Sequence, residues 1–87
     1  MKMEVAMEQG YVYRFLGKNN EVLYIGKTKH LETRLMTHFG KNGHLRPKEY
    51  AQVHSVQYIT FPSYNDAGIM EIVFIDYYCP PFNKAIK

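Results

Sequence analysis

Two strand-like segments separated by a short turn constrain this chain more than any other feature of its sequence. Residues 11–16 and 21–26 are rich in aromatic and β-branched side chains, and the Gly-Lys-Asn-Asn run at 17–20 has turn composition. Together they predict a β-hairpin. If the loop contains only those four residues, Tyr13 lies opposite Tyr24, and both phenol groups project from one face of the sheet. An error of one residue in the loop would break that shared facing.

Two short helices are predicted after the hairpin. Apolar side chains at 31, 35 and 39 recur at intervals of four, which favours an amphipathic helix over Lys29–Phe39. Thr28 is placed to cap this helix, and Gly40 is placed to end it. Pro47 suits the first turn of another short helix that reaches about Val53.

The C-terminal part adds a strand and a longer helix. Ser55–Phe61 alternates in polarity as a strand does, and the run 63–66 resembles a capping box that opens a helix over Tyr64–Tyr78. Two prolines at 80 and 81 end that helix. The resulting order is strand, strand, helix, helix, strand, helix. We expect one domain over residues 1–87, with a flexible N-terminus at 1–9.

Composition narrows the setting of the protein. With 87 residues, 46% of them hydrophobic, the chain has room for one modest core. Cys79 is the only cysteine, which excludes an internal disulfide and a Cys-rich zinc site and favours a reducing, cytoplasmic location. Glu4 and Glu8 interrupt the N-terminal stretch, so it does not read as a signal peptide. No segment is long enough to cross a bilayer, and we expect no membrane partner.

Positive charge is concentrated in the middle of the chain. The formal net charge is +3, yet the stretch 27–49 alone holds six Lys or Arg residues against two Glu, together with three of the four histidines. Such a stretch predicts contact with a negatively charged partner such as nucleic acid, although an ordinary solvated face would look the same. The candidate phosphate contacts are Lys27, Lys29, Arg34, Lys41, Arg46 and Lys48.

Three further positions carry potential chemistry. Glu71 lies in the most apolar part of the last predicted helix, so its carboxylate must reach solvent, a cation or a metal. Arg34 and His38 are four residues apart on a helix and share a face, which would allow both to grip a phosphate. Each feature alone also fits a surface residue, and each tyrosine of the hairpin also fits ordinary strand packing.

Taken together and in order, these residues resemble the motifs of the GIY-YIG nuclease family over almost the whole chain. The matching positions are the run Tyr11–Tyr13, the intact run Tyr24–Gly26, then Lys27, Arg34, His38, Glu71 and finally Asn83 within Pro80–Asn83. The family fold, α+β with a three-stranded antiparallel sheet flanked by helices, agrees with the order β-β-α-α-β-α. One position departs: the first motif normally opens with glycine, but here Tyr11 follows Gly10. That departure bears on local packing, because the motif tyrosine is retained as Tyr13.

The resemblance implies a metal-dependent endonuclease that hydrolyses phosphodiester bonds. We expect its substrate to be DNA, although the sequence itself does not distinguish DNA from RNA. Glu71 would be the only protein ligand of a Mg²⁺ or Mn²⁺ ion. Tyr13 would be the general base or would orient the attacking water, with the pKa of its phenol lowered by Lys27 and Arg34.

The remaining roles also follow from the resemblance. Arg34 would bind the scissile phosphate, and Tyr24 and His38 would position the nucleophile or relay a proton. Asn83 would fix the architecture of the site through its amide.

Other functions stay open on sequence alone. The chain could be a non-catalytic nucleic-acid-binding module that retains the fold, or a protein-interaction domain with an aromatic surface. A zinc role for the histidines and Cys79 fits poorly, because their spacing matches no compact ligand set. The sequence does not fix the oligomeric state. Specificity would come from this domain, from DNA structure or from an unidentified partner protein.

Overall fold

The computed structural model describes residues 9–83, so the predicted flexible N-terminus lies outside them except for Gln9, as does the end of the chain after Asn83. The expected order of elements is confirmed. They are β1 (Gly10–Leu16), β2 (Val22–Thr28), α1 (Leu31–His38), α2 (Pro47–Tyr50), β3 (Ser55–Phe61) and α3 (Tyr64–Tyr78). Within residues 9–83, every helix is too short or too polar to cross a membrane.

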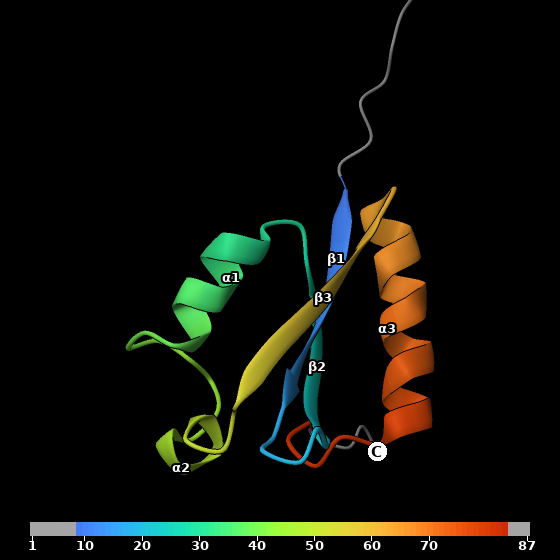
Figure 1. Ribbon diagram of the computed structural model, residues 1–87. Helices are drawn as coiled ribbons and strands as arrows, with labels where there is room; N and C mark the ends of the chain where they lie inside the picture. The colour runs from blue at the N-terminus through green and yellow to red at the C-terminus, as the bar shows by residue number, and fades with distance from the viewer. Residues whose placement is uncertain (1–8, 84–87) are drawn as a thin grey trace, which may run out of the picture.

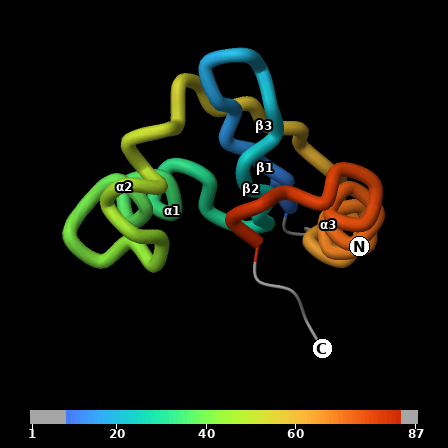
Figure 2. The backbone as a smooth tube through the Cα atoms, turned by 90° about the horizontal axis from the view of Figure 1, so that it is seen from below, coloured from blue at the N-terminus to red at the C-terminus, as the bar shows by residue number. Residues whose placement is uncertain are grey.

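The three strands form one antiparallel sheet in the order β2-β1-β3, with β1 in the centre. Helices α1 and α2 lie on one face of this sheet and α3 lies on the other, as both views show (Figures 1 and 2). Helices therefore lie on both sides of the sheet, and β2 and β3 are its edge strands, of which β3 is largely exposed. The architecture agrees with the α+β class predicted from the sequence.

The predicted register of the hairpin is wrong. Tyr13 pairs with Gly26 rather than with Tyr24, and Tyr24 pairs with Phe15. The ladder shifts between Phe15 and Leu16, and the tight turn relies on Asn20, whose φ of 62° is left-handed. Tyr13 and Tyr24 nevertheless share a face, with ring centroids 6.2 Å apart.

The first helix is shorter than predicted. It begins at Leu31 with His30 as the N-cap residue, so Thr28 is not its cap. The Thr28 hydroxyl instead accepts a hydrogen bond from the His30 backbone N–H at 3.0 Å, which delays the first helical turn. The second helix ends at Tyr50 instead of Val53.

Local signals located the last two elements correctly. Ser55–Phe61 and Tyr64–Tyr78 have the predicted bounds. Ser63 caps α3 through its hydroxyl, which accepts a hydrogen bond from the Asp66 backbone N–H at 3.1 Å. Cys79 ends the helix in a left-handed conformation, and the prolines follow.

Two apolar clusters occupy the two faces of the sheet. One, around Tyr13 and Phe15, packs against α1 and α2, and the other, around Val12 and Ile25, packs against α3. Gly10 is needed where β1 meets the start of α3, because a Cβ there would lie 2.7 Å from the Ala67 Cβ. The glycine one position before the expected one therefore serves the packing of β1 against α3.

Candidate active site

His38, the last residue of α1, is buried between two phenol groups. Its Nε2 lies 2.7 Å from the Tyr13 hydroxyl and its Nδ1 lies 2.8 Å from the Tyr50 hydroxyl. Burial, followed by the positive charges of His44 and Arg34, lowers the pKa of His38 to about 4. The ring is therefore neutral at pH 7, so it donates to one hydroxyl and accepts from the other.

Tyr13 is fully enclosed under α1. Its side chain has no exposed surface, and its ring lies against Gly26, where any Cβ would overlap the Tyr13 hydroxyl. The expectation that nearby cations lower its pKa is wrong. Burial and the neighbouring Tyr24 raise the pKa of Tyr13, and the guanidinium of Arg34 offsets this only in part. Tyr13 is thus a protonated phenol at neutral pH.

Tyr24 is the more accessible of the two motif tyrosines. It is half-buried, and its ring centroid lies 5.5 Å from that of His38. Burial raises the pKa of Tyr24, and the nearby carboxylate of Glu71 raises it further. A hydrogen bond from Tyr13 and the charge of Arg34 act in the opposite direction. Tyr24 therefore connects the phenol cluster to the charged groups of the site.

Glu71 and Lys27 bring opposite charges together between α3 and β2. The Lys27 Nζ lies so close to α3 that a Cβ on Gly68, one helical turn before Glu71, would be 3.0 Å from it. Burial raises the pKa of Glu71, whereas Lys27 and Arg34 lower it through their charges. The carboxylate is half-buried, and the absence of a Gly68 side chain leaves room for its cationic neighbour.

Arg34 interacts electrostatically with the other four residues predicted as catalytic. It is exposed on α1, and its charge acts on the pKa of Tyr13, Tyr24, His38 and Glu71. Helices α1 and α3 lie on opposite faces of the sheet (Figure 2), and Tyr24 and Lys27 both belong to strand β2. The structure thus brings together all five residues predicted as catalytic, with Lys27 beside them.

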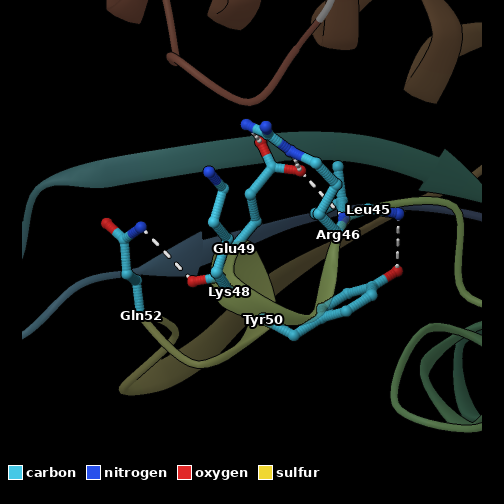
Figure 3. Close-up of polar contacts among 6 residues, drawn as sticks. All are labelled: Leu45, Arg46, Lys48, Glu49, Tyr50 and Gln52. Atoms are coloured by element: carbon cyan, nitrogen blue, oxygen red, sulfur yellow. Dashed lines mark hydrogen bonds and ion pairs between the residues drawn. The ribbon is translucent and has the colours of Figure 1, made fainter.

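The predicted phosphate contacts are spread over several elements. Lys27 and Lys29 each place their Nζ 5.1 Å from the ring of Tyr64, at the start of α3. Arg46 is paired with Glu49 at 3.3 Å, as Figure 3 shows, so its charge is partly neutralised. The two remaining lysines, Lys41 and Lys48, are exposed.

Two site residues were missed by sequence reasoning. The Tyr50 hydroxyl, besides contacting His38, accepts a hydrogen bond from the Leu45 backbone N–H at 3.3 Å (Figure 3). The ring of His44 lies 5.1 Å from that of His38 and 5.4 Å from that of Tyr24. Both come from the segment between α1 and β3, which carries no motif and whose folding back over His38 has no local signal.

Asn83 contacts the same strand from the opposite end of the sequence. Its Oδ1 accepts from the Ile25 N–H at 2.9 Å, and its Nδ2 donates to the Ile25 carbonyl at 2.8 Å. The Asn83 amide thereby makes the two hydrogen bonds that the backbone of a fourth strand would make with the edge strand β2.

Comparison with known proteins assigns this arrangement to a family. The model of the UvrC-like GIY-YIG domain matches residues 9–84. The chain belongs to the GIY-YIG endonuclease family. Among its relatives, UvrABC system protein C of Arthrobacter sp. is 39% identical over 79 residues, and that of Renibacterium salmoninarum is 36% identical over 87. These alignments cover 87% and 97% of the GIY-YIG chain but only 12% and 13% of the relatives, so the chain spans about one eighth of their length.

Solved structures show the same GIY-YIG fold. The N-terminal endonuclease domain of UvrC from Thermotoga maritima, bound to its catalytic magnesium, superposes with a TM-score of 0.78 and 28% identity, covering 92% of this chain and 89% of that one. A variant of that domain with an asparagine-to-alanine substitution, also bound to its catalytic divalent cation, gives a TM-score of 0.79 with 26% identity, covering 93% and 89%. The predicted family and fold are both confirmed.

Proposed function

We propose that this domain is a Mg²⁺- or Mn²⁺-dependent endonuclease that hydrolyses phosphodiester bonds in DNA. The observation that carries the proposal is the convergence of the motif residues on Tyr24. Its ring centroid lies 6.2 Å from that of Tyr13 and 5.5 Å from that of His38, and the charges of Arg34 and Glu71 both act on its pKa. A cation surrounded by such groups can bind a phosphate and stabilise the charge that develops on it. The magnesium-bound Thermotoga maritima domain supports the choice of metal.

Glu71 has the properties of a ligand for a hard cation. Its carboxylate is half-buried, and burial raises its pKa despite two neighbouring positive charges. A divalent ion would stabilise this charge, and Mg²⁺ commonly takes one carboxylate while water and phosphate oxygens fill its other positions. When bound, the ion would neutralise charge on the phosphate and acidify its coordinated water.

We assign the orientation of the attacking water to Tyr24 rather than to Tyr13. Tyr24 is half-buried and lies within the electrostatic reach of Glu71, whereas Tyr13 is enclosed and bonded to His38. Tyr13 and His38 then hold Tyr24 in place from behind. Arg34 binds the scissile phosphate, and Lys27 stabilises the negative charge of Glu71.

DNA binding is assigned to the exposed basic residues. Lys29, Lys41 and Lys48 are accessible for contacts with phosphates, and Arg46 contributes less because Glu49 pairs with it. Such contacts release counterions and make binding sensitive to salt. Because the UvrABC relatives are far longer than this chain, we infer from them only the hydrolysis of phosphodiester bonds. We propose that this domain itself or a partner protein selects the DNA to be cut.

Plasmid nicking tests the proposal. We expect the protein to convert supercoiled plasmid to the open-circular form with Mg²⁺ or Mn²⁺ and to stop when a chelator is added. Glu71→Gln and Arg34→Ala should each lower the rate by roughly 100-fold or more, in the range found when one group that stabilises the transition state is removed. Asp76→Asn, an exposed acid on the same helix, is the matched control and should keep the rate.

Two results would contradict the proposal. Equal nicking by Glu71→Gln and by the native protein would remove Glu71 from the chemistry. Salt-dependent DNA binding without cleavage under either metal would favour the non-catalytic binding module instead.

A further inference from the structure

A pair of tyrosines extends the face of the active site along the sheet. Tyr58 on β3 pairs with Tyr13 on β1, so both side chains belong to the same face. Tyr11 lies two residues before Tyr13 and shares that face too. The rings of Tyr11 and Tyr58 meet edge to face, with centroids 6.2 Å apart and planes at 68°. This aromatic pair is therefore the neighbour of the buried site on the open part of the sheet.

The pair remains in contact with solvent. Tyr58 is 58% exposed, and neither ring belongs to the two apolar clusters of the described residues. Tyr11 stands where the resembled first motif has glycine, so this position carries a large ring in place of no side chain. Their mutual contact supports the pairing of β1 with β3, and it leaves ring surface of Tyr58 free to meet a ligand.

A hollow of about 480 Å³ opens beside the pair, between the sheet and the start of α1. Besides the two tyrosines, it is lined by Lys29, His30, Leu31, Glu32, Thr33 and Thr60. Lys29 supplies positive charge to this hollow, and among its described lining residues Glu32 is the one acid. The composition combines aromatic rings with a cation and hydroxyl groups, which suits a nucleobase attached to a phosphate.

We propose that the hollow binds an unpaired nucleobase next to the scissile phosphate, so the preferred substrate carries unpaired nucleotides beside the cut. This inference rests on the proposed nuclease function. A base inside a duplex is stacked on both faces and cannot offer one to a tyrosine, whereas an unpaired base can. Stacking on Tyr11 and Tyr58 accepts any base, so the site selects DNA structure and not sequence.

Binding in the presence of chelator tests this inference without any cleavage. The probes are fluorescent duplexes with a blunt end, with a short single-stranded overhang, and with the same overhang made abasic so that only its sugar-phosphate backbone remains. We expect removal of the bases to weaken binding by the native protein roughly tenfold, because stacking of one base contributes about that factor. The comparison uses the native chain and needs no substitution.

Variants then locate the effect. Tyr58→Ala should bind both overhangs equally, whereas Tyr58→Phe keeps the ring and should retain the preference. Tyr77→Ala removes a tyrosine that is 77% exposed on α3 and should also retain it. The inference is overturned if the native protein does not distinguish the two overhangs, or if Tyr58→Ala weakens blunt-duplex binding as much as overhang binding. Failure of the proposed function appears separately, as absence of nicking with metal.

Discussion

Replacement of Asn83 by alanine should destabilise the domain through the edge of β2. The Asn83 amide donates to and accepts from the backbone of Ile25, at 2.8 and 2.9 Å. Ile25 itself is only 2% exposed, so its two backbone groups have limited access to replacement water. Truncation of Asn83 removes both bonds and leaves a buried donor and a buried acceptor without their partner.

The expected loss follows from these two bonds. A net contribution of about 1 kcal/mol for each gives about 2 kcal/mol, and incomplete hydration of Ile25 would increase it. Small domains unfold with about 5 to 15 kcal/mol, so the variant should still fold. For a domain of this size, about 2 kcal/mol corresponds to a fall in Tm of about 8 to 16 °C.

Thermal and urea unfolding followed by circular dichroism measure this loss. Asn42→Ala, in the exposed loop after α1, is the matched control and should change stability by less than about 0.5 kcal/mol. Asn83→Asp keeps an acceptor for the Ile25 N–H but at neutral pH loses the donor, so it should also be destabilised. If Asn83→Ala unfolds within about 0.5 kcal/mol of the native protein, the amide does not support the edge of β2 and the reasoning is refuted.

Three further predictions concern the interior of the site. Gly26→Ala should lower the free energy of unfolding by about 1 to 3 kcal/mol in urea titrations, because its Cβ would overlap the Tyr13 hydroxyl. Gly68→Ala should raise Tm, since alanine favours helix by up to about 1 kcal/mol, yet slow plasmid nicking by displacing Lys27. The pKa of His38 is lowered from 6.5 to about 4 in the folded protein, so the unfolded chain takes up a proton at higher pH than the folded one. The free energy of unfolding should therefore fall as pH drops from 6.5 to about 4, by up to about 1.4 kcal/mol per pH unit. His38→Gln should reduce this slope.

Much of the fold was predictable because its signals are local. The bounds of β3 and α3 follow from Pro62 and from the Ser63 cap, each of which acts within a few residues. The start of α1 was misplaced because Thr28 offered two uses for its hydroxyl, capping or bonding to His30, and propensity alone does not choose between them.

The motif residues of the site were predictable, but their electrostatic state was not. Positive charge near Tyr13 is visible in the sequence, whereas its complete burial depends on how α1 closes over β1. Burial outweighs the guanidinium, which reverses the expected direction of the pKa shift. His44 and Tyr50 escaped notice for a related reason, since their contacts with His38 arise from a tertiary path without a sequence pattern.

The shared facing of Tyr13 and Tyr24 depends on two departures from the predicted hairpin that compensate for each other, a longer loop and a bulge. Leu16 pairs with Val22, and continued without a shift that pairing would place Tyr13 opposite Ile25 and turn Tyr24 to the other face. The bulge inserts Leu23 as one extra residue on β2, which restores the parity and explains why Leu23 packs in the same cluster as Tyr13. The shared facing of the two tyrosines therefore depends on the number of loop residues plus the extra bulge residue, and not on either number alone. Removal of a single loop residue should disrupt it, unless the bulge is lost as well.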